Sequence, residues 1–383
     1  MSSFIVPHIM HHGPGSLAQL KSIKGKKAVI VTGAGSMRRL GYIDKTQALL
    51  KEAGIASAVF DGVEADPSVE TVRRGFEFFK QEKPDIIIGL GGCSAIDAAK
   101  AMWIFYEYPE STFEEICVPF AVKPLRNKAK FIAIPSTSGT GTEVTCCAVI
   151  TDREAGTKYP IVTYEICPDI AIVDGELAAG MPASVTANTG MDALSHDAEA
   201  FVATLATPYT DALAKESVLM VFENLPKAMA DGKNIDVRQK MHDASCMAGM
   251  SFSNALLGII HSMSHQVGGT FGVPHGRSNA ILMPNVIRYN SKATKKYEIL
   301  ADLFGKKSAE DFAQLCDGLR QQVGIEKTYK EYGIDAKQWA EKIDQMTAHA
   351  MADPCTGANP RKPTAAEIKK IYQCCYDGTI VDF

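Results

Sequence analysis

Long apolar runs, an excess of one charge and CxxC motifs are all missing from this chain of 383 residues. Its longest apolar stretches, such as residues 86–90, are as short as one β-strand and cannot cross a bilayer. The 40 basic and 44 acidic residues give a formal net charge of −4, so neither nucleic acid nor a membrane is expected as a partner. The length and the hydrophobic content of 46% indicate a globular protein of two domains.

The ten cysteines are scattered through apolar segments, and no two of them form a CxxC pair. The first residues, MSSFIVPHIMHHGPGSL, contain no basic segment that leads into an apolar run, so we expect no secretory signal. Reduced, buried thiols and a cytoplasmic location are therefore expected in place of disulfides.

Residues 1–182 alternate short β-branched runs with amphipathic stretches, a pattern typical of an α/β domain with a mostly parallel sheet covered on both faces. Strands are predicted at 27–32, 57–60, 86–90, 131–134 and 170–173, and helices at 40–53, 67–81 and 94–106.

Strand-like runs disappear after residue 182, and long helical patterns replace them. Helices are predicted at 183–205, 208–224, 237–253 and 255–268, with shorter ones up to residue 372. We therefore expect a Rossmann-like α/β domain over 1–182 and an all-helical domain over 183–383.

Three loops rich in glycine, serine and threonine each follow a predicted strand, at 33–36, 91–94 and 136–142. Ligands of parallel sheets bind at the carboxyl ends of strands, and glycines let a phosphate approach the backbone. Three such loops predict a dinucleotide site. The sequence lacks both the GxGxxG fingerprint after the first strand and the GxxxxGK[ST] loop, which argues against a standard Rossmann dehydrogenase and a P-loop NTPase.

Four candidate metal ligands stand in two short segments of the helical half. Asp192 and His196 are four residues apart and share one helix face, while His261 and His275 lie within 258–276. One carboxylate and three imidazoles can hold one divalent transition metal and leave a position open for substrate. The pattern predicts a metal-dependent enzyme.

Four segments carry a resemblance to a known family: GGCSAIDAAKA (91–101), PSTSGTGTEVT (135–145), GMDALSHDAEAFV (190–202) and HSMSHQVGGTFGVPHG (261–276). With them the chain resembles the iron-containing (group III) alcohol dehydrogenases, and within that family the clostridial NADPH-dependent butanol dehydrogenases. The resemblance covers nearly the whole chain. It implies a dehydroquinate synthase-like architecture, with NAD(P) on the N-terminal domain and a metal on the helical one.

Carried over motif by motif, the resemblance assigns the metal to Asp192, His196, His261 and His275, with Fe²⁺ expected and Zn²⁺ as the alternative. The residues expected at the cofactor are Gly33, Gly35, Ser36, Arg39, Gly91, Gly92, Cys93, Ser94, Asp97, Thr137, Ser138, Thr140, Thr142, Lys158, Leu177 and His265. Cys93 departs from the family, which usually has a third glycine there. That change is harmless if its backbone φ is negative.

Gly33 also departs from many NAD-dependent members, which carry an aspartate after the first strand. An aspartate there would accept from the ribose hydroxyls and repel a 2′-phosphate. Gly33 removes that charge, and Arg38 and Arg39 follow in a loop suited to a phosphate. NADP(H) is therefore expected in preference to NAD(H).

The metal and the cofactor together predict reversible hydride transfer between NADP(H) and a short-chain primary alcohol or aldehyde of butanol size, with the metal as Lewis acid on the substrate oxygen. His265, one turn after His261, is expected as a catalytic proton-relay or cofactor-contact residue. The alternatives are a fifth ligand, a residue that orients a metal ligand, and a structural histidine. Two other functions stay open, an NAD-linked diol or hydroxy-acid dehydrogenase and a metal-dependent lyase. No partner is identified for His242, and a homodimer is expected from the family.

Overall fold

The computed structural model describes residues 3–154 and 157–383, and the chain divides into two compact units. Unit 1 comprises the chain up to Met181 together with Lys233–Gly249, and unit 2 comprises Pro182–Gly232 and Met250–Phe383. The division of the sequence into domains at residue 182 stays a prediction. Within the described residues, no helix is both long and apolar enough to cross a membrane.

Unit 1 is built on a six-stranded sheet with the order β1-β8-β5-β4-β2-β3, and every neighbouring pair in it is parallel. The strands are β1 Ile9–His12, β2 Lys27–Gly33, β3 Ala56–Val63, β4 Ile86–Gly91, β5 Lys130–Pro135 and β8 Ile170–Val173. The helices up to Met181 are η1 Ser16–Ser22, α1 Ser36–Arg39, α2 Tyr42–Glu52, α3 Val69–Glu82, α4 Cys93–Glu107, α5 Phe113–Ile116, η2 Thr142–Val144, η3 Tyr164–Ile166 and α6 Gly175–Ala178. The larger part of α9 (Ile235–Ala255) also belongs to unit 1.

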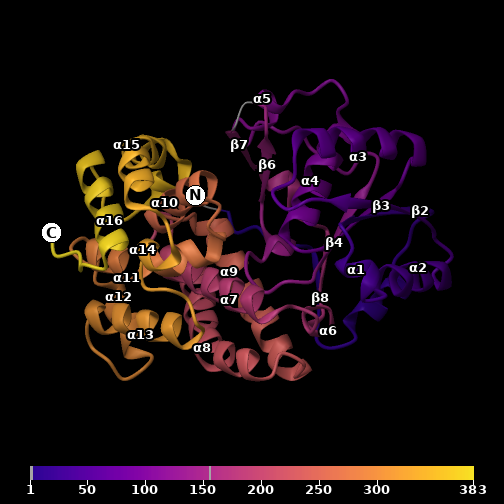
Figure 1. Cartoon of the computed structure of the whole chain (residues 1–383). Coiled ribbons are helices and arrows are strands. Elements are labelled where there is room, and N and C mark those ends of the chain that lie inside the picture. The colour runs from indigo at the N-terminus through magenta and orange to yellow at the C-terminus, as the bar shows by residue number, and fades with distance from the viewer. Residues whose placement is uncertain (1–2, 155–156) are drawn as a thin grey trace. The chain divides into compact units, whose positions relative to one another are not determined.

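Alternate residues of the strands supply two separate cores, one on each face of the sheet. Val29 and Val31 of β2 pack with α3 and α4, whereas Ala28 and Ile30 pack with α2 and η1. Figure 1 shows α3 and α4 on one side of β2–β4 and α1 and α2 on the other. The predicted parallel sheet, covered on both faces, is confirmed.

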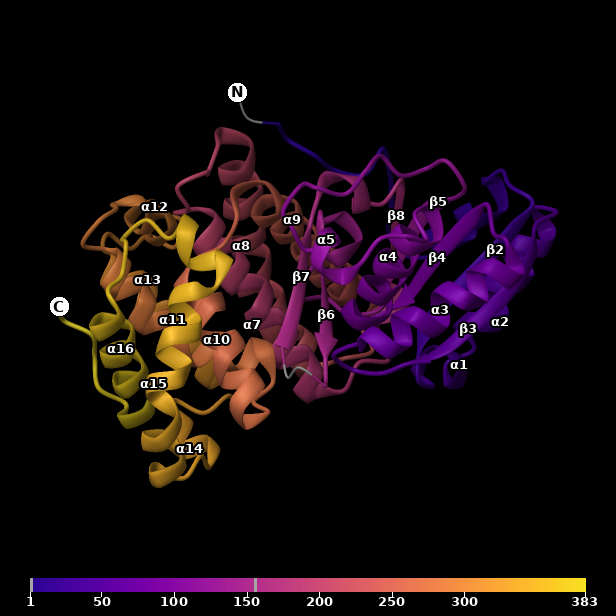
Figure 2. The same cartoon turned by 90° about the horizontal axis from the view of Figure 1, so that it is seen from above.

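A two-stranded hairpin was not anticipated from the sequence. Strand β6 (Cys147–Asp152) pairs antiparallel with β7 (Thr157–Val162), and Figure 2 shows them side by side. The backbone N–H of Val149 donates to the Asp97 carboxylate of α4 at 2.9 Å, so a buried side chain sets this hairpin against the sheet domain. Each strand has only a short apolar run, CAVI in β6 and YPIV in β7, and a proline inside the second run argues against a strand.

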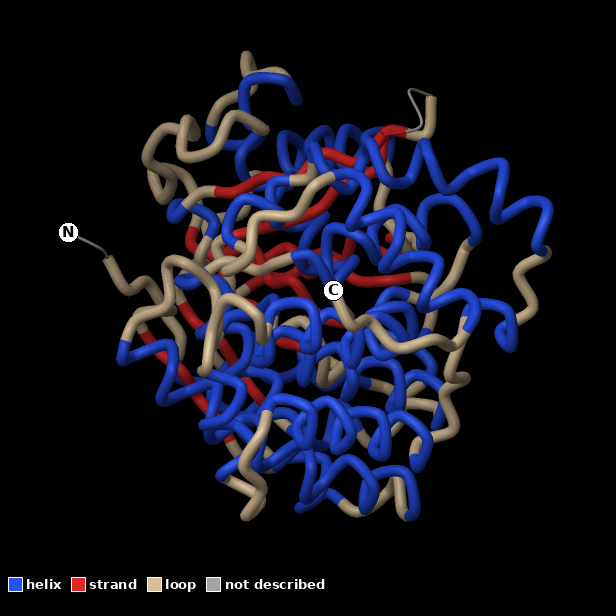
Figure 3. The backbone as a smooth tube through the Cα atoms, turned by 90° about the vertical axis from the view of Figure 1, so that its left-hand side faces the viewer, coloured by secondary structure: helices blue, strands red, loops and turns tan. Residues whose placement is uncertain are grey.

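Unit 2 is helical, and Figure 3, in which helices are blue, shows how much of the chain they occupy. The helices beyond residue 182 are α7 Ala183–Ala200, α8 Pro208–Ala230, α9 Ile235–Ala255, α10 Ile259–Phe271, α11 His275–Asn290, α12 Lys296–Asp302, α13 Ala309–Gln322, α14 Tyr329–Tyr332, α15 Ala336–Ala352, η4 Pro354–Ala358 and α16 Ala365–Asp377. The predicted helix at 255–268 was placed too early. Helix α9 continues to Ala255, Leu256 follows with a φ of 66°, and α10 begins only at Ile259.

One fully buried lysine holds the connection between the sheet and the hairpin. The ammonium of Lys100 donates to the backbone carbonyls of Thr142, Thr145 and Cys147 at 2.7, 2.8 and 3.0 Å. These carbonyls lie away from water, so each needs its donor.

We predict that Lys100→Met lowers the free energy of unfolding by at least about 3 kcal/mol, because it leaves three buried carbonyls and the nearby Asp97 without their cation. Urea unfolding followed by circular dichroism measures the change. Lys80→Met, on the exposed face of α3, is the matched control and should keep the wild-type midpoint. Equal midpoints for both variants would contradict this account.

Candidate active site

The three glycine-rich loops meet at one edge of the sheet in unit 1. Thr32 of β2 is paired with Leu90 of β4, and Gly91 of β4 is paired with Pro135 of β5, so the strands end side by side. The N–H of Ser136 donates to the carbonyl of Gly91 at 2.8 Å, which joins the second loop to the third. The structure therefore brings the predicted loops together.

The second loop has the backbone that an anion site needs. Gly91 has a φ of 143°, which favours glycine, and Gly92 precedes the first turn of α4 without a side-chain cap on its N–H groups. Cys93 is the first helical residue and is not among the positive-φ positions, so its side chain imposes no backbone strain. The helix dipole and the first N–H groups of α4 would favour a phosphate here.

His242, for which the sequence indicated no partner, hydrogen-bonds to the third loop. His242 is buried; its Nδ1 lies 2.8 Å from the Ser138 hydroxyl and its Nε2 3.2 Å from the Pro135 carbonyl. A carbonyl only accepts, so Nε2 carries the hydrogen and Nδ1 accepts from Ser138. Burial lowers the pKa of His242 to about 4, which keeps the ring neutral in this role.

Helix α9 also limits the third loop sterically. Gly141 has a φ of 64°, and a Cβ on it would lie 2.5 Å from the Ser245 carbonyl oxygen. Within the same loop, the Thr142 hydroxyl donates to Asp97 at 2.7 Å. Asp97 and Thr142 therefore bond to each other and support the loop from inside.

Two more residues expected at the cofactor, and the neighbour of a third, have partners inside unit 1. Lys158 on β7 forms an ion pair with Asp66 at 2.8 Å, and Leu177 in α6 is buried in the core. Arg38, next to Arg39, pairs with Asp61 of β3. The assignment of these residues to a cofactor stays a prediction.

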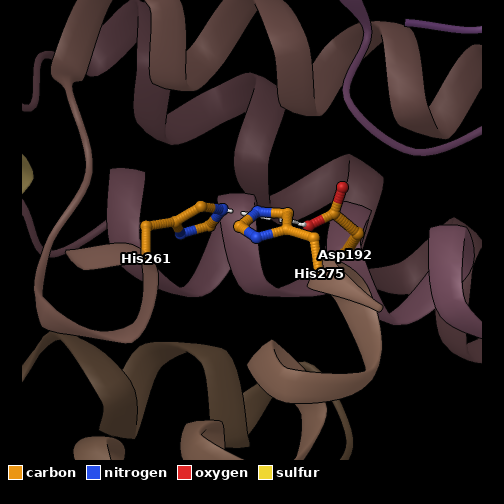
Figure 4. Close-up of side chains that lie close together, drawn as sticks. All are labelled: Asp192, His261 and His275. Carbon is orange, nitrogen blue, oxygen red and sulfur yellow. Dashed lines mark ion pairs between the residues drawn. The ribbon is translucent and has the colours of Figure 1, made fainter. Parts of the chain in front are cut away.

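Three of the four expected metal ligands form a compact group in unit 2. Their donor atoms, from Asp192 on α7, His261 on α10 and His275 on α11, all lie within 4.8 Å of one another. The Asp192 Oδ1 is 3.9 Å from the His261 Nε2 and 3.5 Å from the His275 Nε2 (Figure 4). Only His275 is substantially exposed, with 40% of its side chain accessible.

The donor chemistry fits a divalent cation. Asn279 places one amide nitrogen 2.8 Å from Asp192 and 3.2 Å from the Nε2 atoms of both His261 and His275. Three acceptors thus converge on one point, and an amide has only two hydrogens to give them. Burial raises the pKa of Asp192 to about 7 and lowers that of His261 well below its usual value. A cation among these donors would favour the ionised form of Asp192 and could bind the neutral ring of His261 directly.

His261 is oriented by a second carboxylate that the sequence analysis missed. Its Nδ1 lies 2.6 Å from Glu199, whose other oxygen accepts from the Ile260 N–H at 2.5 Å. This contact leaves Nε2 facing Asp192, as in the carboxylate–histidine–metal arrangements of metalloproteins. Glu199 lies seven residues after Asp192, two helical turns on, and that spacing was the available signal.

His196 lies beside this group. Its ring stacks on His261 with centroids 4.5 Å apart and on Phe252 at 4.3 Å. The donor group itself consists of the other three residues, so His196 as the fourth ligand stays a prediction.

His265 lies on the same side of α10 as His261, as the spacing predicted. Its ring stacks on His275 at 5.3 Å, and its Nδ1 is 2.8 Å from the Asp353 Oδ2. Asp353 comes from the segment between α15 and η4 and could not be placed from sequence spacing, because 88 residues separate the two.

Comparison with known proteins decides the family. The family description "Iron-containing alcohol dehydrogenase" matches residues 7–175, and "Fe-containing alcohol dehydrogenase family, C-terminal" matches 186–376. The chain belongs to the iron-containing alcohol dehydrogenase family. It is an NAD(P)-dependent oxidoreductase acting on alcohols, and the lyase alternative is not favoured. The family resemblance inferred from the sequence is confirmed.

Several relatives resemble the chain along its whole length. An NADPH-dependent butanol dehydrogenase of Clostridium saccharobutylicum is 52% identical over 100% of both chains. A 1,3-propanediol dehydrogenase of Klebsiella pneumoniae is 36% identical over 97% of this chain and 98% of its own. The solved structure of an iron-containing alcohol dehydrogenase from Thermococcus thioreducens superposes with a TM-score of 0.92 at 34% identity, over 98% of this chain and 100% of that one. The predicted fold class is confirmed.

We predict that Glu199→Gln weakens divalent-metal binding roughly 10- to 100-fold, because the glutamine lacks the charge that makes His261 a stronger ligand. Competition with a chromogenic chelator measures the change. Glu223→Gln, on the exposed face of α8, serves as the control and should bind as the wild type does. Wild-type affinity in Glu199→Gln would show that Glu199 does not act on the metal.

Proposed function

We propose that this protein reversibly transfers a hydride between NADP(H) and a short-chain primary alcohol or aldehyde of butanol size. The observation that carries the proposal is the convergence of Asp192, His261 and His275 on one point, in a chain 52% identical to a butanol dehydrogenase. A bound divalent cation, iron by family and zinc as the alternative, would polarise the substrate carbonyl and stabilise an alkoxide.

The residues have distinct roles in this proposal. Asp192, His196, His261 and His275 hold the cation, and Glu199 orients His261. The loops at 33–36, 91–94 and 136–142 bind the dinucleotide, with the N-terminus of α4 at its pyrophosphate.

His265 serves as proton relay or cofactor contact, since Asp353 holds its Nδ1 and leaves Nε2 as the second ring nitrogen. A domain division at residue 182, a homodimer and a cytoplasmic location belong to the same proposal.

Butanal tests the proposal directly. We expect the iron-reconstituted protein to oxidise NADPH when butanal is added. The loss of NADPH absorbance measures the reaction, which should stop when a chelator removes the metal. Restoring Fe²⁺ or Zn²⁺ should restore the rate. Inactivity after both reconstitutions, across a panel of short aldehydes, would refute the proposed reaction.

Gly33 tests the cofactor preference. A Cβ at Gly33 meets only the Val63 carbonyl, at 3.4 Å, so a side chain fits there. Gly33→Asp places a carboxylate after β2 and should lower the NADPH-to-NADH ratio of kcat/KM by about tenfold or more, through repulsion of the 2′-phosphate. Gly33→Asn has the same size without the charge and should change the ratio much less. An equal effect in both variants would assign the change to bulk.

A further inference from the structure

A second group of metal-binding side chains lies next to the first in unit 2. The donor atoms of His265, Asp353 and Cys355 all lie within 4.8 Å of one another. None of the three belongs to the expected ligand set, and they supply one nitrogen, one oxygen and one sulfur. That mixture suits Zn²⁺ and other soft divalent ions.

The group is held in place by its own hydrogen bonds. Asp353 accepts from the His265 Nδ1–H at 2.8 Å and, through its other oxygen, from the Cys355 N–H at 3.0 Å. The Cys355 thiol also bonds to the Asp353 carboxylate. Thr356 donates to Ser262 of α10 at 2.8 Å, so the segment that carries Asp353 and Cys355 is tied to the helix that carries His265. The donors are therefore preorganised.

Ions can reach this group. The side chain of His265 is 32% exposed and that of Asp353 is 12% exposed, whereas His261 is only 2% exposed. The His265 N–H and the Cys355 S–H both donate to the Asp353 carboxylate. A cation can replace these two hydrogens and bind all three side chains.

We propose that His265, Asp353 and Cys355 form a second, inhibitory site for a soft divalent cation such as Zn²⁺ or Cd²⁺. Binding forms bonds to the His265 Nδ1, an Asp353 oxygen and the Cys355 sulfur. The thiol proton is released to solvent, and the histidine hydrogen moves from Nδ1 to Nε2 through solvent. One proton leaves for each cation bound, and no electron is transferred.

Inhibition follows from the position of His265, whose ring stacks on His275 at 5.3 Å. This part of the inference rests on the proposed function, in which His265 takes part. A cation on Nδ1 would replace its Asp353 partner and put the hydrogen on Nε2, so the ring could no longer accept a proton there. Iron, which prefers thiolate less strongly than zinc does, would compete poorly for this site.

Cadmium titration of the full chain tests the site without any need for activity. We expect the wild type to bind two equivalents of Cd²⁺, and one of them to give a cadmium–thiolate absorption band. Cys355→Ser should lose that band and bind one equivalent. Cys117→Ser, which changes another half-buried cysteine, should keep both. Asp192→Asn should weaken the other equivalent and keep the band.

A single equivalent in the wild type, or an unchanged band in Cys355→Ser, would overturn the site and leave the three residues as a hydrogen-bonded group only. In a separate arm, excess Zn²⁺ should inhibit the iron-loaded wild type at concentrations that leave Cys355→Ser at its own uninhibited rate. Equal inhibition of both would overturn the inhibitory role. A protein inactive toward aldehydes would still report on cadmium, so failure of the proposed function is told apart from failure of the site.

Discussion

The arrangement of Asp192, His261 and His275 depends on the hydrogen bonds made by the buried carboxylate of Glu199. Burial among the helices raises the pKa of Glu199 to about 8, and the backbone N–H groups at the start of α10 oppose this rise by donating to the carboxylate. Helix α10 has no side-chain cap of its own, so a residue of α7 takes that place. The same contact fixes how far His261 on α10 stands from Asp192 on α7. The contacts of Glu199 thus satisfy a buried carboxyl group, cap the start of α10 and set the distance between two expected metal ligands.

Unit 1 uses buried polar groups in a comparable way. Lys100 and His242 each join backbone carbonyls or hydroxyls of the segment that follows β5, and neither side chain reaches solvent. Buried polar groups stabilise the fold only when every donor and acceptor has a partner. This requirement restricts the loop to one geometry. In the proposed cofactor site this rigidity would favour phosphate binding, because the loop would lose little conformational freedom when the phosphate binds.

Periodicity predicted the elements that repeat regularly and are long. The β-branched runs at 27–32 and 86–90 and the helical stretch at 183–205 all correspond to observed elements. The β6–β7 hairpin was not predicted because its apolar runs are short and Pro160 interrupts the second of them. Helical spacing linked only Asp192 to His196, whereas the structure gathers Asp192, His261 and His275 from three different helices. The segments that hold these three residues were connected in the sequence by the family motifs and not by spacing. His242, Asp353 and Asn279 were missed because their roles arise from contacts between distant segments, on which spacing carries no information.

The glycines of the nucleotide half differ in how much sequence variation they allow. A side chain at Gly141 would clash with the α9 backbone, and Gly91 has a φ that L-residues avoid, whereas a Cβ at Gly33 would make only an ordinary contact with the Val63 carbonyl. A side chain is therefore tolerated at Gly33 in the first loop, whereas Gly91 and Gly141 in the other two loops must stay glycine. In the proposed cofactor site, the two constrained loops would bind the pyrophosphate that all dinucleotides share, and the variable position would face the ribose phosphate by which NADP differs from NAD.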